Sequence, residues 1–206
     1  MIPQNPIRDG NVPIASLPRA HFAAILADPP WRFETWSDAG KDRSPEQHYS
    51  TMMMDELRRL DVAALATVDS VLFMWATWPT IPHAFALIEA WGFTYKTCGF
   101  CWTKADASQL DMFRDDADVA IGTGYWTRAN TEPCLLATRG QPRRIHADVR
   151  QAIIEPRREH SRKPDGIHDR IERLVAGPYL EMFARRRRFG WTVWGNEIPR
   201  NPERAP

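Results

Sequence analysis

The sequence is poor in cysteine, with only Cys98, Cys101 and Cys134 among its 206 residues. Three thiols cannot form a closed set of disulfides, and the chain opens without the basic and then apolar segment of a secretory signal. We therefore expect a reducing, cytoplasmic environment. The spacing of Cys98 and Cys101 occurs in zinc and redox sites, but a second pair is missing and apolar neighbours favour a strand. We predict no metal site.

Long apolar runs are missing as well. The longest apolar stretch, 71–93, is interrupted by Pro79, Pro82 and His83, so it is too polar and too kinked to cross a bilayer. With 43% hydrophobic and 26% charged residues, the composition excludes a disordered, collagen-like or cystine-stapled chain. No internal repeat or linker is visible. We expect a single domain over residues 1–206, loosely held at its ends, about 1–12 and 199–206.

Net charge is almost absent, because 27 basic residues stand against 26 acidic ones. The average conceals a polarised chain: residues 1–120 carry 16 acidic and 10 basic side chains, whereas residues 121–206 carry 10 and 17. Basic blocks in the second part, such as 185–188, are compatible with phosphate binding. A solvated surface is the default for any single pair. Only four of the 27 basic residues are lysines, and this excess of arginine also fits a bias in codon usage.

Short apolar runs alternate with helical patterns, which is typical of an α/β fold with a doubly wound, mostly parallel sheet. Strands are predicted over 22–27, 71–76, 95–103, 134–138, 179–184 and 191–194. Helices are predicted after Thr51 as the cap, over 81–91, and from Pro164 until Gly177-Pro178 ends the helix. The long connection 104–131 is a candidate functional loop.

The string Asp28-Pro29-Pro30-Trp31 follows the first predicted strand, at the end where open α/β sheets bind ligands. Its chemistry suits methylation of an exocyclic amine of a nucleobase. The Asp28 carboxylate and the Pro29 carbonyl can accept both amine hydrogens and stabilise positive charge on the nitrogen, while Trp31 offers a face for stacking the base. A proline-terminated strand with a core tryptophan is a comparable interpretation of the isolated string.

In its context, the string resembles the adenine-specific amino-methyltransferase family that includes the catalytic subunit of the eukaryotic mRNA adenosine methyltransferase and its bacterial and phage relatives. The resemblance runs from about residue 9 to residue 198 and rests on the order and spacing of motifs that are modest alone. These are ILADPPW (25–31), YSTMMMDELRRL (49–60), LFMWAT (72–77), WGF (91–93), WTK (102–104), GTGYW (122–126) with Glu132, SRKPD (161–165), IERL (171–174), EMFAR (181–185) and WTVWGN (191–196).

In this family the catalytic loop precedes the strand that normally opens a cofactor-binding Rossmann unit. The resemblance therefore implies a Rossmann-like methyltransferase fold with a circularly permuted motif order, which explains why an early glycine-rich fingerprint is missing. The Gly122-x-Gly124 pair lies outside a strand-to-helix turn and suits a turn better than dinucleotide binding.

The resemblance also implies a site for S-adenosylmethionine beside the catalytic loop. Lys163 matches a lysine that neutralises the carboxylate of this cofactor, although a solvated lysine is the alternative. Asn196 matches a ribose contact, and helix capping is its alternative. The implied roles are catalytic for Asp28, Pro29, Pro30 and Trp31, substrate-binding for Tyr49 and Trp31, and cofactor-binding for Asp28, Lys163, Arg185, Asn196, Glu197, Asp9 and Asn11.

One segment departs from the family pattern. Soon after the position of Arg185 the family has a His-Asn pair, whereas this chain has Arg186 to Arg188 and a loop shorter by two residues. Contacts to the methionine part of the cofactor are expected to differ, or the arginines meet substrate phosphate. Four guanidinium groups beside a sulfonium would repel one another, so we expect most of them to point outward.

We therefore expect S-adenosylmethionine-dependent methylation of the N6 amine of adenine in DNA or RNA, by direct in-line transfer. A catalytically silent, nucleic-acid-binding partner subunit is the main alternative, and methylation of a small molecule or a protein amide is a weaker one. Since 206 residues leave little room for a separate recognition domain, a homodimer or a partner subunit is a further expectation.

Overall fold

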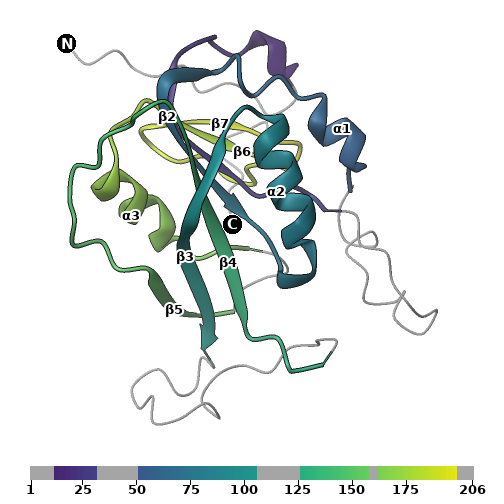
Figure 1. Ribbon diagram of the computed structural model, residues 1–206, viewed down its shortest axis with the longest axis vertical. Helices are drawn as coiled ribbons and strands as arrows, with labels where there is room; N and C mark the ends of the chain where they lie inside the picture. The colour runs from purple at the N-terminus through teal and green to yellow at the C-terminus, as the bar shows by residue number, and fades with distance from the viewer. Residues whose placement is uncertain (1–11, 32–50, 106–125, 158–161, 199–206) are drawn as a thin grey trace.

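The structure, a computed structural model, describes residues 12–31, 51–105, 126–157 and 162–198. These residues build a seven-stranded sheet in the order β5-β3-β4-β2-β1-β6-β7 (Figure 1). The helices are α1 (Met54–Arg58), α2 (Ile81–Ala90) and α3 (Gly166–Leu174). The strands are β1 (Phe22–Ala27), β2 (Ala66–Trp75), β3 (Thr94–Ala105), β4 (Thr131–Arg139), β5 (Ala152–Pro156), β6 (Tyr179–Met182) and β7 (Trp191–Trp194).

The sheet is mostly parallel, which confirms the predicted α/β class. β4 pairs antiparallel with β2 and β3, while the other four pairings are parallel. β1 lies inside the sheet, with β2 on one side and β6 on the other. Along the sequence, β2 to β5 on one side of β1 come before β6 and β7 on the other side, as the permuted motif order implies. The carboxyl ends of β1 and β6 therefore form a topological switch point, where open α/β sheets bind ligands.

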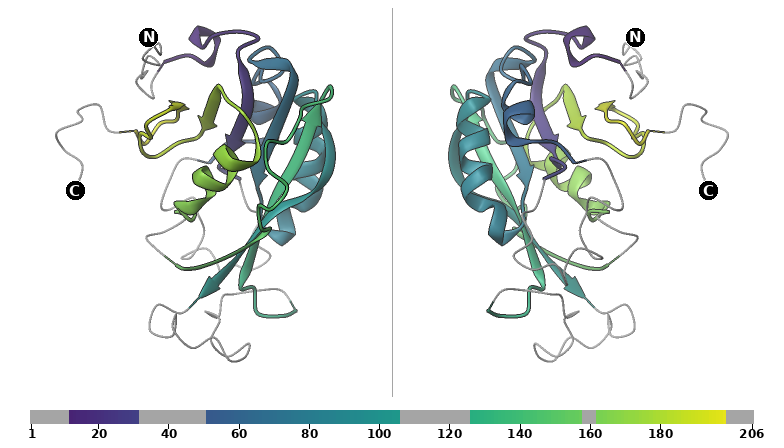
Figure 2. Two further views of the ribbon diagram at one scale, coloured as in Figure 1. Left: turned by 90° about the vertical axis from the view of Figure 1, so that its left-hand side faces the viewer. Right: turned by 90° about the vertical axis from the view of Figure 1, so that its right-hand side faces the viewer.

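β1 shows why the sheet is covered on both faces. Successive side chains of a strand point to opposite faces, so Ala24 and Leu26 join one hydrophobic core while Ile25 and Ala27 join the other. The first core includes Ile167 of α3, and the second includes residues of α1 and α2. Figure 2 shows α3 on one side of the sheet and α2 on the other. A continuous apolar run is what a strand buried on both faces requires.

Several elements differ from the sequence-based expectation. The strand predicted from residue 71 begins at Ala66, and β5 is an unpredicted edge strand in which only Ile153 is buried. The cap predicted at Thr51 is wrong: α1 follows Met53, whose backbone N–H donates to the Glu56 carboxylate at 2.7 Å. α3 begins at Gly166, two residues beyond the predicted start. Among the described residues, none of the helices is long and apolar enough to pass through a membrane.

Two expectations lie outside the described residues. The first concerns the chain ends, expected to be loosely held, of which only Val12 is described. The second concerns the expected loop 104–131, most of which is not described.

Gly195 permits a close approach of two backbone segments after β7. An added Cβ would lie 2.2 Å from the carbonyl oxygen of Ala184 and 2.6 Å from its nitrogen. The Ala184 N–H donates to the carbonyl of Trp194 at 3.0 Å, which holds the segment after β6 against the end of β7. Only a residue without a side chain fits between them.

We expect Gly195→Ala to lower the free energy of unfolding by roughly 1–3 kcal/mol, because backbone atoms would have to move apart. Denaturant unfolding measures the loss. Gly166→Ala is the matched control, since its added Cβ meets only the flexible end of Glu155. A Gly195→Ala protein as stable as the parent would contradict the close approach.

Candidate active site

Asp28 is positioned by the abrupt end of β1. Ala27 pairs with Met74 of β2 and with Met182 of β6, so the next residue lies between the ends of both neighbouring strands. Pro29 and Pro30 lack an N–H and cannot continue the ladder. The carbonyl of Pro29 accepts from the N–H of Trp31 at 2.8 Å, and that of Pro30 accepts from Met52 at 3.0 Å. The turn is therefore fixed, with the Asp28 carboxyl at the switch point.

Lys163 links two carboxylates at this edge of the sheet. Its Nζ lies 2.9 Å from Oδ2 of Asp28 and 3.5 Å from Oε2 of Glu132, and Glu132 also pairs with Lys104. All four side chains are at most 26% exposed. Lys163 also lies 5.9 Å from the ring centroid of Trp75. Four charges from distant parts of the chain thus alternate in sign at an edge of the sheet that is largely shielded from solvent.

The two carboxyls are biased in opposite directions. Burial raises the pKa of Asp28, and Glu132 adds to the rise, although Lys163 and Arg185 counteract it. Burial also acts to raise the pKa of Glu132, but Lys163 and Lys104 together outweigh it and lower that pKa. Asp28 is therefore the better proton acceptor of the pair, while Glu132 is held as an anion.

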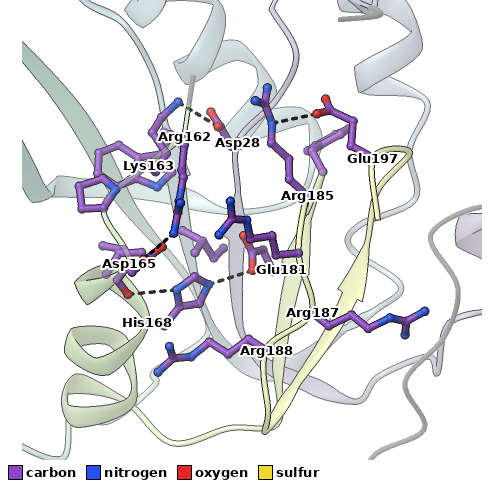
Figure 3. A pocket seen from close by; sticks show the side chains of 16 residues that line it. Asp28, Arg162, Lys163, Asp165, His168, Glu181, Arg185, Arg187, Arg188 and Glu197 are labelled. Atoms are coloured by element: carbon purple, nitrogen blue, oxygen red, sulfur yellow. Dashed lines mark hydrogen bonds and ion pairs between the residues drawn. The ribbon is translucent and has the colours of Figure 1, made fainter. Parts of the chain in front are cut away.

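A cleft of about 530 Å³ opens beside Lys163 (Figure 3). Its volume is within the range of small-molecule binding sites. Asp28, Lys163, Arg185 and Glu197, four of the residues that the sequence predicts for the site, line it together. The Nε of Arg185 lies 3.4 Å from a carboxylate oxygen of Glu197. The cleft brings a cation, an anion and a charged pair to the predicted cofactor position.

His168 and Glu181 line the cleft as a pair that has no predicted role. Nε2 of His168 lies 2.8 Å from Oε2 of Glu181, and the imidazole packs edge-on against Trp191 with ring centroids 4.8 Å apart. A carboxylate between the buried residues Leu180 and Met182 was the available sequence signal for this pair.

The arginine run lies along the cleft. Arg185, Arg186, Arg187 and Arg188 all border the cleft, although Arg187 extends away from Lys163 and Asp28 in Figure 3, so the outward direction of most of them stays a prediction. Carboxylates relieve the repulsion. Arg188 lies 2.5 Å from Asp169 and 3.2 Å from Glu172 of α3, and Arg185 faces Glu197.

Trp31 lies in the hydrophobic core and is 7% exposed, with its indole N–H donating to the carbonyl of Trp75 at 3.3 Å. This is the position that the alternative interpretation expects, and stacking against a base stays a prediction. Asn196 is exposed in the turn after β7, and its ribose contact also stays a prediction. Tyr49, Asp9 and Asn11 lie outside the described residues.

Glu132 is a site residue to which the sequence analysis assigned no role. It stands near the beginning of β4, and in a parallel strand that position would be at the opposite edge of the sheet. Because β4 is antiparallel, with Cys134 opposite Trp75, its beginning reaches the carboxyl edge. The direction of this strand, which sequence pattern does not reveal, brings Glu132 to Lys163.

The cysteines lie on strands. Cys98 and Cys101 belong to β3 and Cys134 to β4, and burial raises the pKa of all three thiols. Within the described ranges, no group of three or more His, Cys, Asp and Glu side chains is arranged to hold a metal ion.

The chain resembles known methyltransferases along most of its length. It is 32% identical to the type II methyltransferase M.MunI of Mycoplasma sp, over 92% of this chain and 83% of that protein. It is 34% identical to a probable N(6)-adenosine-methyltransferase MT-A70-like protein of Oryza sativa subsp. japonica and 30% identical to the human N(6)-adenosine-methyltransferase catalytic subunit METTL3. Each of these two matches covers 86% of this chain.

The relatives differ in size. The chain spans only 23% of the rice protein and 28% of the human protein. The profile of the MT-A70 family matches residues 22–197, which include both Asp28 and Lys163. The chain therefore belongs to the MT-A70 family of methyltransferases.

Proposed function

We propose that this protein transfers a methyl group from S-adenosylmethionine to the N6 amine of adenine in DNA or RNA. The observation that carries the proposal is the contact between Asp28 and Lys163, which joins the catalytic loop to the cleft at a distance of 2.9 Å. Relatives named as N(6)-adenosine-methyltransferases support adenine as the acceptor, and the name of M.MunI supports methyl transfer.

The residues of the cleft fit S-adenosylmethionine. Lys163 offers a point charge for its carboxylate, and Asp28 and Glu181 offer anions for its ammonium and sulfonium groups. Glu197 can accept hydrogen bonds from the ribose hydroxyls. Bound there, S-adenosylmethionine would supply an activated methyl group. The carboxylates of Asp28 and Glu181 add to those of Asp169, Glu172 and Glu197, which pair with Arg185 and Arg188, and together they offset the charge of the four arginines beside a cationic ligand.

Asp28 has two tasks at the acceptor. Its carboxylate and the carbonyl of Pro29 accept the two amine hydrogens of adenine, which localises the nitrogen lone pair and stabilises the charge that develops there. The Pro29 carbonyl already accepts from Trp31 but has a second lone pair. As the amine becomes acidic, the raised pKa of Asp28 makes it a better proton acceptor than an ordinary carboxylate.

The rigid double-proline turn adds a positional contribution. The chain fixes the acceptor carboxylate and the cofactor lysine in one ion pair, so little reorganisation accompanies transfer. Holding two reactants in such a geometry can contribute about 7–11 kcal/mol in favourable intramolecular models.

We expect Asp28→Asn to abolish methyl transfer to an adenine-containing oligonucleotide without lowering the unfolding temperature at pH 7. A raised pKa means that this carboxyl stabilises the fold only at low pH, and that this contribution is lost as the pH rises through its folded pKa. Removing the anion therefore removes a cost at pH 7. Radiolabelled transfer and thermal unfolding of the same preparation measure both effects.

Glu132→Gln is the matched comparison, and it should lower stability at pH 7 by roughly 1–3 kcal/mol. The pKa of Glu132 is lowered, so its contribution is present above the ordinary pKa and is lost as the pH falls through the folded one. The deficit should vanish in acid. An Asp28→Asn protein that retains activity, or that is destabilised as much as Glu132→Gln, would refute the assignment of Asp28.

We further expect S-adenosylmethionine to raise the unfolding temperature of the parent protein, since a ligand at about 100 times its Kd adds about 2.7 kcal/mol of stability. Lys163→Met should lose most of this increase because the cofactor carboxylate loses its counter-ion. Lys96→Met, at an exposed lysine of β3, is the control. An unchanged shift in Lys163→Met would remove Lys163 from the cofactor site, and no shift in the parent would favour a catalytically silent partner.

A further inference from the structure

Trp78 is a large aromatic side chain exposed beside the proposed active site. It begins the short 3-10 turn Trp78–Thr80, three residues after the end of β2, and is 53% exposed. Phe85 and Tyr95 are exposed aromatics too, but they pack against each other with ring centroids 4.8 Å apart. Within the described residues the Trp78 ring has no such aromatic partner, and its indole N–H donates a hydrogen bond from the ring edge.

The turn that carries Trp78 is rigid. The N–H of Thr77 donates to the hydroxyl of Thr80 at 3.0 Å, and that hydroxyl lies 2.9 Å from the carbonyl of Thr77. The indole N–H donates to the hydroxyl of Thr131 at 2.9 Å. The only polar atom of the ring is thereby satisfied, so its remaining binding capacity is the aromatic face. Holding an exposed ring in one orientation reduces the entropy that binding would cost.

Thr131, which accepts the hydrogen bond from the indole, is next in sequence to a charged residue of the proposed active site. Thr131 precedes Glu132, which pairs with Lys163 at 3.5 Å, and Lys163 pairs with Asp28. β4 and β1 flank β2, so Thr131 lies about 10 Å from the Asp28 strand across the sheet. The register also places Thr131 three residues, or about 10 Å, beyond Asp28 along the strands. That separation corresponds to a few nucleotides of a stacked strand, at about 3.4 Å each.

We propose that Trp78 is a substrate-binding residue whose indole face stacks on a nucleobase that flanks the target adenine in a single-stranded segment. This inference rests on the proposed function and names the strand conformation that the site accepts. A base presents a π-face whatever its identity, so stacking would hold the strand without requiring a particular neighbouring base. It would also help to keep the target adenine out of a base stack.

The test compares Trp78→Ala, Trp78→Phe and the control Phe85→Ala. Fluorescence anisotropy with a single-stranded oligonucleotide that contains one adenine gives Kd at fixed salt, and radiolabelled transfer gives kcat and both KM values. We expect Trp78→Ala to raise the Kd and KM for the oligonucleotide on the order of tenfold. Its KM for S-adenosylmethionine and its unfolding temperature should stay unchanged, and Trp78→Phe and Phe85→Ala should resemble the parent.

A second oligonucleotide separates stacking from a structural role. It carries abasic sites at each of the few positions next to the adenine on both sides. We expect the parent to bind it more weakly than the intact strand, and Trp78→Ala to bind both strands equally. Unchanged oligonucleotide binding by Trp78→Ala would overturn the inference. So would a Trp78→Phe variant as damaged as Trp78→Ala, because loss of the Thr131 hydrogen bond would then be responsible.

The two proposals fail in different ways. A parent protein that transfers methyl groups normally while Trp78→Ala matches it refutes the role of Trp78 alone. A parent protein that transfers no methyl group to DNA or RNA refutes the proposed function, and the anisotropy comparison then decides on stacking independently.

Discussion

The site depends on the placement of one ammonium group, that of Lys163, between two carboxylates at the edge of a sheet. A buried charge is costly unless it is paired, and Lys163 compensates both Asp28 and Glu132 while Lys104 adds a second cation at Glu132. The four segments that supply these groups are the turn after β1, the end of β3, the beginning of β4 and the approach to α3. The fold must bring their ends together for any of the charges to be tolerated.

The burial of the Asp28 carboxyl at the end of β1 lowers the stability of the fold but serves the proposed reaction. The interior of β1 is apolar on both faces, and the first polar side chain that follows it is the one whose pKa burial raises. A protein selected only for stability would carry a neutral group at residue 28, whereas a proton acceptor has to be ionised when the amine reaches it. Glu132 has the opposite balance, because its two lysines make the anion favourable. Lys163 thus contacts both carboxylates, of which Glu132 is the more stable anion and Asp28 the better proton acceptor.

Sequence pattern predicted six of the seven strands, and it missed β5 and the first half of β2. β1 and β7 occupy their predicted ranges because both are apolar runs bounded by residues that end a strand. The first half of β2 and the edge strand β5 alternate irregularly between exposed and buried positions, and they were missed. The family resemblance predicted Asp28, Lys163, Arg185 and Glu197 as site residues, and the structure places all four along one cleft. Glu132 and the pair His168–Glu181 depend on strand direction and on contacts between distant segments, which no local pattern encodes.

Chemical identification of the product tests the central claim most directly. Short DNA and RNA strands would be incubated with the protein and isotopically labelled S-adenosylmethionine, digested to nucleosides and analysed by mass spectrometry. The arrangement of Asp28, Pro29 and the cleft predicts a single labelled nucleoside, adenosine or deoxyadenosine methylated on N6. Label on another base or on a ring nitrogen of adenine, or no label on either nucleic acid, would contradict it.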